Sequence, residues 1–186
     1  MENPKLGHLL IISFMLMITV AAAAPTWSHS ICRGKKQITT FHFYVHDVRG
    51  GPNATLYPVA SAPITADSPT RFGQINVFDD LVTAEPDISS PEVARVQGTT
   101  TSADLRVRAV SMNMNFFITA GEFKGSTISV VGRNAVSDAE RELPVVGGTK
   151  AFRNARGYAI TKSYSNDVAT NYSVIEYTIY VTSTKL

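Results

Sequence analysis

Apolar and polar residues alternate along most of the chain beyond residue 39, which is the pattern of half-buried β strands. Val, Ile, Thr, Tyr and Phe dominate these segments, and Gly, Pro, Asn and Asp separate them. No long stretch has the periodicity of a helix. The pattern predicts these strands: Thr40–Val48, Thr55–Ala60, Gln74–Leu81, Ala94–Thr101, Leu105–Thr119, Ser126–Asn134, Gly157–Ser163 and Tyr172–Thr182.

Many short strands joined by tight turns indicate an all-β sandwich or barrel. A closed barrel has no free sheet edges and, with about eight strands, can hold a small ligand inside. The number of strands therefore favours a closed barrel. We interpret residues 141–149 as a connection between two strands, and we expect the long strand Leu105–Thr119 to bend or break near Val110.

The first predicted strand carries an acidic residue on its most apolar face. Phe41, Phe43, Val45 and Asp47 share this face, because successive strand residues point to opposite sides. Burial would raise the pKa of Asp47, whereas a nearby cation would lower it, and a perturbed carboxyl group of this kind is a candidate site residue. The alternative is an aspartate that caps the loop at 50–53, and the spacing leaves both interpretations open.

A methionine-rich row lies on one face of the strand Leu105–Thr119. Met112, Met114, Phe116 and Ile118 alternate with mostly polar neighbours, so this strand has a buried face and a wetter face. Methionine adapts its shape readily, so such a wall suits a flat aromatic ligand. The alternative for each methionine is ordinary core packing.

Two further polar residues are candidates for the same site. Asn134 ends an apolar row that includes Ile128 and Val130, which places an amide at the inward end of its strand. Arg141 is able to reach the same region and to pair with Asp47 or with a phenolate. The alternative is a surface arginine that pairs with Glu140 or Glu142, its neighbours in the chain.

The first 24 residues predict a signal peptide. Lys5 gives a basic start, Leu9–Val20 is almost entirely apolar, and the small residues Ala21–Ala24 mark a cleavage site. The apolar run is short for a membrane anchor, which needs about 20 residues. We therefore predict cleavage near Ala24 and secretion without membrane attachment. Residues 25–186 have the length of one domain, in which we expect 25–38 to be flexible.

Composition agrees with a secreted domain and excludes one class of partner. The net charge of +2 and the absence of a basic run argue against nucleic acid binding. The only cysteine, Cys32, cannot form an intrachain disulfide, and we favour an unpaired thiol over a bridge to a second chain. Asn53-Ala54-Thr55 and Asn171-Tyr172-Ser173 are sequons, which predict surface glycosylation at Asn53 and Asn171.

The sequence contains no motif for a metal, a phosphate group or a dinucleotide. His42 and His46 would lie about 13 Å apart on a strand, too far for one metal ion. The segment 147–150 lacks the spacing of a phosphate-binding loop, and there is no Gly-x-Ser-x-Gly element. We therefore expect neither a metal nor a cofactor, and the chain has no visible redox centre of its own.

Several segments resemble the plant dirigent family, in the family's order and across nearly the whole chain after the signal peptide. They are Phe43–Asp47 with Asn53–Thr55, Val93–Gly98, Lys124–Thr127, Arg141–Thr149 and Phe152–Tyr158. The resemblance implies an eight-stranded antiparallel β-barrel that is secreted to the apoplast. It also implies assembly as a homo-oligomer, a trimer or, in older descriptions, a dimer.

The resemblance implies that the ligands are phenolic small molecules or their radicals. The family's best-known role is to hold two monolignol radicals, such as those of coniferyl alcohol, so that one lignan stereoisomer forms. An external laccase or peroxidase makes the radicals, in agreement with the missing redox centre. One alternative is an enzyme of the lyase type, which dehydrates and cyclises isoflavonoid alcohols through a quinone methide to give pterocarpans. Another is a cell-wall defence protein that binds phenols without turnover.

The family's pocket uses an aspartate and an arginine at positions that match Asp47 and Arg141, which are therefore our candidate catalytic residues. Lignan-forming members have a second aspartate where this chain has Asn134, and an amide cannot take up a proton. Many members carry aromatic residues where this chain has 99–102, and some have a C-terminal cysteine that is absent here. These departures place the chain outside the best-characterised lignan-forming group. We expect four residues to contact the substrate: Phe43, Thr100, Met114 and Asn134.

Overall fold

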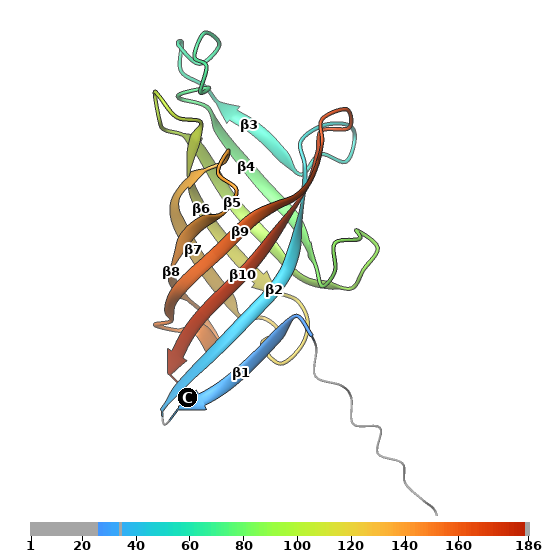
Figure 1. The fold of residues 1–186 in the computed structure, drawn as a ribbon, viewed down its shortest axis with the longest axis vertical. Helices are drawn as coiled ribbons and strands as arrows, with labels where there is room; N and C mark the ends of the chain where they lie inside the picture. Colours follow the sequence, from blue (N-terminus) through green and yellow to red (C-terminus); the bar gives the residue numbers. More distant parts are fainter. Residues whose placement is uncertain (1–25, 34, 185–186) are drawn as a thin grey trace, which may run out of the picture.

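The computed structural model describes residues 26–33 and 35–184. These residues form ten β strands and one short 3-10 helix (Figure 1). The elements are β1 (Ser28–Arg33), β2 (Lys36–Val48), β3 (Leu56–Ala60), β4 (Ile75–Thr83), β5 (Glu92–Ser102), β6 (Ala109–Ile118), β7 (Thr127–Ala135), β8 (Arg141–Gly148), η1 (Lys150–Phe152), β9 (Arg156–Asp167) and β10 (Tyr172–Thr184).

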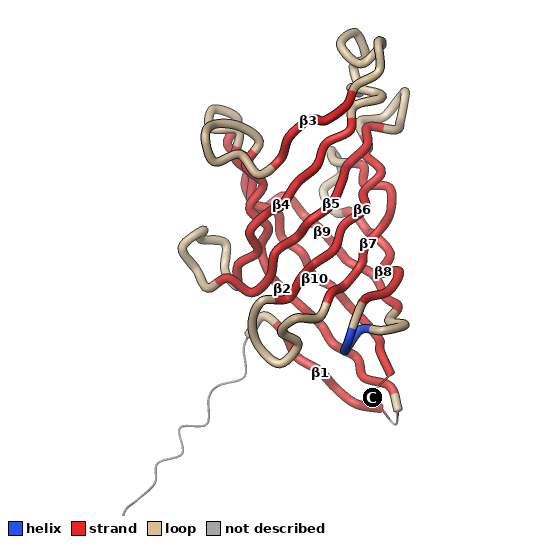
Figure 2. The backbone as a smooth tube through the Cα atoms, turned by 180° about the vertical axis from the view of Figure 1, so that it is seen from behind, coloured by secondary structure: helices blue, strands red, loops and turns tan. Residues whose placement is uncertain are grey.

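Eight of these strands close into an antiparallel barrel, as the sequence predicts. Their order around the barrel is β2-β10-β9-β8-β7-β6-β5-β4, and β4 pairs with β2 to complete the circle. This last pairing is short, since it joins only Tyr44–His46 to Leu81–Thr83. Beyond the short pairing, β1 extends the free edge of β2 and β3 extends the free edge of β4, at opposite ends of the barrel (Figures 1 and 2).

The identity of the eight barrel strands differs from our prediction at two places. Residues 141–148, expected to be a connection, form the barrel strand β8, whereas the predicted strand 55–60 forms β3, which lies outside the closed circle. The sequence pattern did not predict β8, because this strand contains Pro144 and proline is uncommon inside sheets. In the structure Pro144 pairs with Tyr158 of β9, while β7 pairs only with residues 145–148 of β8. The first half of β8 is therefore an edge, where proline is tolerated.

The expected flexible segment 25–38 contains the strand β1 and the start of β2. β1 forms an antiparallel pair with β2 from Ser28 opposite Phe41 to Arg33 opposite Lys36, and Cys32 is exposed on it. Just before β1, Trp27 is buried and stacks on Phe41 with a ring-centroid distance of 5.8 Å. This packing of an apolar ring ties the segment to the barrel.

The predicted signal peptide, 1–24, lies outside the described residues, and no helix within them has the length and apolar character needed to span a membrane.

β6 begins at Ala109 and not at Leu105, where the predicted strand starts. Asp104 accepts hydrogen bonds from the backbone N–H groups of Arg106 and Val107, both at 2.9 Å, and these bonds hold the segment before β6 in a loop.

Large aromatic side chains fill the end of the barrel near β1. Phe41, Phe123 and Phe152 are almost completely buried, with ring-centroid distances of 5.0 to 5.7 Å between them. Together with Trp27 they come from four separate segments: the residue before β1, β2, the β6–β7 loop and η1. This end is a packed core, so the space for a ligand lies at the other end.

Candidate functional site

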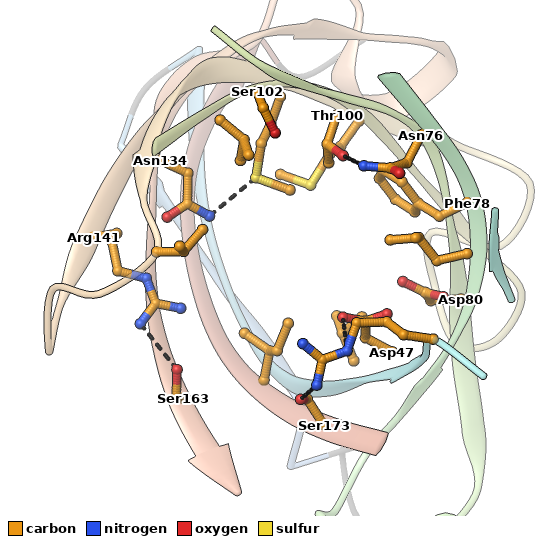
Figure 3. A pocket seen from close by; sticks show the side chains of 18 of the residues that line it. Asp47, Asn76, Phe78, Asp80, Thr100, Ser102, Asn134, Arg141, Ser163 and Ser173 are labelled. Atoms are coloured by element: carbon orange, nitrogen blue, oxygen red, sulfur yellow. Dashed lines mark hydrogen bonds and ion pairs between the residues drawn. The ribbon is translucent and has the colours of Figure 1, made fainter. Parts of the chain in front are cut away.

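A chamber of about 550 Å³ occupies the end of the barrel opposite the aromatic core. All eight barrel strands contribute side chains to its wall (Figure 3). The deeper wall is apolar and includes Val45, Phe78, Val96, Met114 and Tyr177. Polar side chains surround this apolar part, which is the composition of a site that encloses a small, largely apolar ligand and orients it by a few polar contacts.

Asp80 places a buried carboxyl group on one side of the chamber. It follows Asn76 and Phe78 on the inward face of β4, and only 4 % of the residue is exposed. Burial raises the pKa of Asp80 to about 7, and the nearby charge of Asp47 acts in the same direction. A hydrogen bond of 2.5 Å from the Thr55 hydroxyl to Asp80 Oδ1 partly opposes this rise. Asp80 is therefore largely protonated below neutral pH.

Asp47 lies beside Asp80 on the inward face of β2, as the alternation of residues predicts (Figure 3). Its Oδ1 atom is buried without a hydrogen-bond partner in the described chain, and its Oδ2 atom is 3.6 Å from Arg49 Nε. Burial raises the pKa of Asp47, while Arg49 lowers it. A cation next to Asp47 and a hydroxyl next to Asp80 thus give the two carboxyl groups different environments.

Arg49 is held in place by two neighbouring strands at the rim of the chamber. Its Nη2 donates to Asn166 Oδ1 at 2.8 Å and to Ser173 Oγ at 2.6 Å. Ser173 in turn donates to Asn166 Oδ1 at 2.7 Å. The guanidinium is therefore anchored through β9 and β10, which keeps its charge close to Asp47.

Arg141 places a guanidinium on the other side of the chamber (Figure 3). The residue is 7 % exposed and donates to the backbone oxygen of Asp138 at 3.1 Å and to Ser163 Oγ at 3.3 Å. Its Nε is buried without a partner, and within the described residues it forms no ion pair with a carboxylate. Neither Asp47 nor Glu140 neutralises it, since Glu140 pairs with Lys162 at 3.0 Å. The charge of Arg141 remains available for an anionic or strongly polar ligand atom.

Asn134 and Thr100 supply neutral polar groups to the wall. Asn134 Nδ2 donates to Met112 Sδ at 3.0 Å, and its Oδ1 is buried without a partner in the described chain. Thr100 Oγ1 accepts a hydrogen bond from Asn76 Nδ2 at 2.9 Å. Of these atoms, Asn134 Oδ1 is a free acceptor within the described chain, and it is suited to a hydrogen bond from a ligand hydroxyl group.

Tyr177 and Met114 form the base of the chamber. The Tyr177 hydroxyl donates to Met114 Sδ at 3.8 Å, and burial raises the pKa of Tyr177 to about 12. Tyr177 is therefore neutral in the physiological range. Both side chains also touch the core, since Tyr177 packs against Phe116 at a ring-centroid distance of 5.4 Å.

The structure brings together five of the six residues that we expected to catalyse the reaction or contact the substrate. Thr100 and Met114 line the chamber with the three polar candidates, Asp47, Asn134 and Arg141. Phe43 does not line it, because it lies deeper on β2 and packs against Phe116 at 5.3 Å.

The predicted glycosylation sites lie outside the chamber but close to each other. Asn53 and Asn171 are exposed, on the β2–β3 and β9–β10 loops. The backbone oxygen of Asn171 accepts a hydrogen bond from Arg49 N at 2.8 Å, which joins the two loops. The third residues of the two sequons, Thr55 and Ser173, instead bond to groups of the chamber, Asp80 and Arg49.

Sequence reasoning missed Asp80, although a signal for it exists. Asn76, Phe78 and Asp80 alternate on β4 in the same way as Phe43, Val45 and Asp47 on β2. The adjacent Asp79 made this signal ambiguous, since neighbouring strand residues face opposite sides. Asp79 or Asp80 must therefore face outward, and the pairing register of β4 with its neighbours decides which. In the structure Asp79 is outside and pairs with Arg95 at 2.8 Å.

The histidines of β2 act separately and do not form a metal site. His42 Nε2 bonds to Glu176 Oε1 at 2.8 Å, whereas His46 is buried between Thr83 and Tyr172. Across the part of the chain that the structure describes, no three His, Cys, Asp or Glu side chains lie close enough together to bind a metal ion.

The chamber therefore combines three chemical capacities around an apolar space. Asp80 is able to give up a proton near neutral pH, and Asp47 beside it is able to receive one. Arg141, across the chamber, is able to stabilise negative charge on an oxygen atom. Two carboxyl groups in different environments are the usual arrangement for separate acid and base roles.

Comparison with known proteins identifies relatives along most of the chain. The family model described as Dirigent-like protein matches residues 38–182. Dirigent protein 11 of Arabidopsis thaliana is 42 % identical over 169 residues, which are 90 % of this chain and 86 % of the relative. Pterocarpan synthase 1 of Glycine max is 39 % identical over 148 residues, which are 79 % of this chain and 80 % of the relative.

Solved structures of similar proteins share the fold. The structure of a pterocarpan synthase dirigent protein superposes with a TM-score of 0.76 at 39 % sequence identity. The match covers 81 % of this chain and 93 % of that protein. A second pterocarpan synthase dirigent protein gives a TM-score of 0.71 at 37 % identity and covers 80 % of this chain and 97 % of its own.

Proposed function

Because this chain belongs to the dirigent family, we propose that it dehydrates a phenolic benzylic alcohol in its chamber and directs the stereochemistry of ring closure through a quinone methide. One observation carries the proposal: Asp80, protonated near neutral pH, lies beside Asp47 and across from Arg141. The similarity to two pterocarpan synthase dirigent proteins supports it.

The first half of the proposed reaction removes water. Asp80 gives its proton to the benzylic hydroxyl, the C–O bond breaks and water leaves. The phenol para to that carbon loses its proton to solvent, and its electrons enter the ring to form the quinone methide. Arg141 stabilises the negative charge that develops on this oxygen, at the far end of the substrate from Asp80.

The second half closes the ring. A second phenol of the same substrate attacks the electrophilic carbon, and its proton passes to the carboxylate of Asp47. The first phenolic oxygen regains a proton from solvent, and the proton on Asp47 moves to the neighbouring Asp80. The net change is the loss of one water molecule, and both carboxyl groups return to their starting states.

Incubation of an isoflavonoid alcohol that carries the two phenols, without any oxidant, tests this proposal. We expect the cyclised product in enantiomeric excess, and we expect Asp80→Asn to lower turnover by about 100-fold or more, as for loss of a general acid. Asp79→Asn is the matched control, because Asp79 lies on the same strand but faces outward. Wild-type protein without turnover of this substrate class, or equal effects of the two substitutions, would contradict the proposal.

The apolar wall favours a second candidate function, stereoselective coupling of monolignol radicals. Phe78, Met112, Met114 and Tyr177 provide flat or adaptable surfaces for aromatic rings, and orientation alone is able to decide the product of a coupling step. This function needs an external one-electron oxidant, such as a laccase or peroxidase, and no acid.

Chiral chromatography of coniferyl alcohol coupling products separates the two functions. The oxidant is present in every sample, and the protein is added or withheld. A protein-dependent enantiomeric excess that Asp47→Ala reduces in a folded protein supports coupling. A racemic product with oxidant, together with cyclised product without oxidant, supports dehydration.

We also propose that the protein is a secreted glycoprotein. Exposure of Asn53 and Asn171 supports the proposal, since an oligosaccharide needs a surface site. Expression through a plant secretory pathway, followed by enzymatic removal of N-glycans, is the test. A change in mass that Asn53→Gln and Asn171→Gln together abolish is the expected result, and an unmodified chain would contradict the proposal.

A further inference from the structure

We propose that Thr55 is a positioning residue for the acid of the chamber. Its hydroxyl bonds to Oδ1 of Asp80 and thereby leaves the acidic proton on Oδ2, the oxygen free to meet the substrate. This inference deepens the proposed dehydration and rests on it for its functional meaning.

The backbone holds Thr55 in a defined position between β2 and β4. Thr55 N donates to Val48 O at 2.8 Å, and Asp79 N donates to Thr55 O at 3.0 Å. Its side chain is held as well, because Val48 N donates to Thr55 Oγ1 at 3.2 Å. These three bonds join the end of the β2–β3 loop to both strands that carry the chamber's carboxyl groups.

The direction of the Thr55–Asp80 bond follows from the distances. Val48 N–H can only donate, so Thr55 Oγ1 accepts from it and keeps its own hydrogen for another acceptor. Asp80 Oδ1 is 2.5 Å away, whereas Val48 O is 3.5 Å away, at the limit of a hydrogen bond. The hydroxyl therefore donates to Asp80 Oδ1, and a proton on the carboxyl group lies on Oδ2. The carboxyl group of Asp80 points into the chamber (Figure 3).

The same bond adjusts how readily Asp80 gives up its proton. Burial and the charges of Asp47 and Asp79 raise the pKa of Asp80, while the Thr55 bond and Arg95 of β5 lower it. Tyr177 of β10 also faces this region and is neutral. Without the hydroxyl, the pKa of Asp80 would rise further, and the acid would release its proton less readily at neutral pH.

Thr55 is also the third residue of the sequon that begins at Asn53, so a second explanation exists for its hydroxyl. A role in glycosylation alone requires the hydroxyl during chain synthesis and makes no demand on its position in the folded protein. The two roles are separable by substitution. Asn53→Gln removes only the sequon, Thr55→Ser keeps both the hydroxyl and the sequon, and Thr55→Val removes both.

Titration of the Asp80 carboxyl carbon by NMR measures the effect directly. The signal is assigned by its loss in Asp80→Asn, and near-ultraviolet circular dichroism checks that each variant is folded. We expect the Asp80 midpoint to move upward in Thr55→Val and to stay at the wild-type position in Thr55→Ser and Asn53→Gln. An unchanged midpoint in folded Thr55→Val would overturn the inference.

A measurement on the unmodified protein covers the case in which Thr55→Val does not fold. The NMR signal of the Thr55 hydroxyl proton, which is donated to Asp80 Oδ1, should shift with the same midpoint as the Asp80 carboxyl carbon. A hydroxyl signal that is insensitive to this titration would also overturn the inference.

The pH profile of turnover connects this contact to the reaction. We expect the alkaline limb to follow the Asp80 midpoint upward in Thr55→Val, with turnover at neutral pH reduced about tenfold, roughly the value of one hydrogen bond to a reacting group. Because the NMR titration uses no substrate, a wild-type protein without turnover counts against the dehydration alone. An unmoved Asp80 midpoint counts against the role of Thr55 alone.

Discussion

Asp80 links the chemistry of the chamber to the stability of the fold. Its pKa is about 7 in the folded protein and near the ordinary 3.8 in the unfolded chain. Below the lower value both states are protonated, and the group does not oppose folding. As the pH rises from about 4 to 7, only the unfolded chain ionises, so Asp80 lowers the free energy of unfolding. A site that keeps a proton at neutral pH therefore reduces stability there.

We predict that Asp80→Asn raises stability at neutral pH while it removes activity. Asparagine is close in size and carries no charge, so the variant lacks the penalty of a few kcal/mol that the raised pKa of Asp80 imposes on the wild-type fold at and above about pH 7. The measurement is chemical denaturation of wild type and variant at pH 4 and at pH 7.5. The stabilisation should be large only at the higher pH, and an equal effect at both would show that protonation is not its cause.

His46 gives stability the opposite dependence on pH. The ring is buried, with Nε2 2.6 Å from Thr83 Oγ1 and Nδ1 2.5 Å from Tyr172 Oη, and burial lowers the pKa of His46 below its usual 6.5. The charge of Asp87 opposes this shift in part. A lowered pKa means that the stability from the neutral ring is complete above about pH 6.5 and is lost as the pH falls through the folded-state value.

We predict that His46→Gln makes the melting temperature less sensitive to acid between pH 7.5 and 5. Glutamine keeps a donor and an acceptor but takes up no proton in this range. His42→Gln is the control, since His42 is on the same face of β2 but its side chain is 42 % exposed. If both variants keep the wild-type slope, the acid sensitivity arises from another group.

At the scale of the strand, glycine permits contacts in which a neighbouring backbone approaches unusually closely. A Cβ atom on Gly157 of β9 would lie 1.9 Å from Tyr180 O of β10, and one on Gly98 of β5 would lie 2.0 Å from Asn113 O of β6. In contrast, a Cβ on Gly147 of β8 would meet Arg156 Nη1 at an ordinary 3.9 Å. The barrel therefore needs glycine at the first two positions and tolerates a side chain at the third.

We predict that Gly157→Ala lowers the free energy of unfolding by about 1–3 kcal/mol, since the contacted atom is backbone and both strands must shift. Gly147→Ala, also within a strand, should change it by about 0.5 kcal/mol or less. Urea denaturation of the two variants provides the comparison. Equal losses would mean that strand propensity, and not the close approach, explains the effect.

At the scale of the whole molecule, the barrel divides into a packed end and an open end. Phe152 lies in the aromatic core and is fully buried, while Met114 lies at the base of the chamber. The core end carries the large aromatic side chains that stabilise the barrel, and the open end carries the carboxyl and guanidinium groups of the chamber. This separation allows the chamber to vary without loss of the fold.

We predict that Phe152→Ala and Met114→Ala affect different properties. Phe152→Ala should lower the free energy of unfolding by about 3–5 kcal/mol, the usual cost of removing a buried aromatic ring. At temperatures where it stays folded, its products should have wild-type stereochemistry. Met114→Ala enlarges the chamber and should change the enantiomeric excess. A Phe152→Ala protein that is folded but loses stereoselectivity would contradict the division of roles.

Much of the site follows from local patterns that the sequence displays. Alternation on β2 and β7 places Asp47 and Asn134 at the inward ends of apolar rows, because successive strand residues must face opposite sides. The prediction failed where two choices were locally equivalent. Asp79 and Asp80 differ only in register, and Pro144 concealed a strand that is possible because half of β8 lacks a partner on β7.

By itself, the sequence determined the fold class, most of the strands and the inward direction of Asp47, Met114 and Asn134, since these depend on the periodicity of single strands. Tertiary structure alone decided which strands close the barrel. It also decided that Phe43, expected to contact the substrate, lies in the core. It also brought Asp80 to Asp47 and Thr55, and it left Arg141 without a carboxylate partner. These features depend on contacts between residues far apart in the chain, which no local pattern encodes.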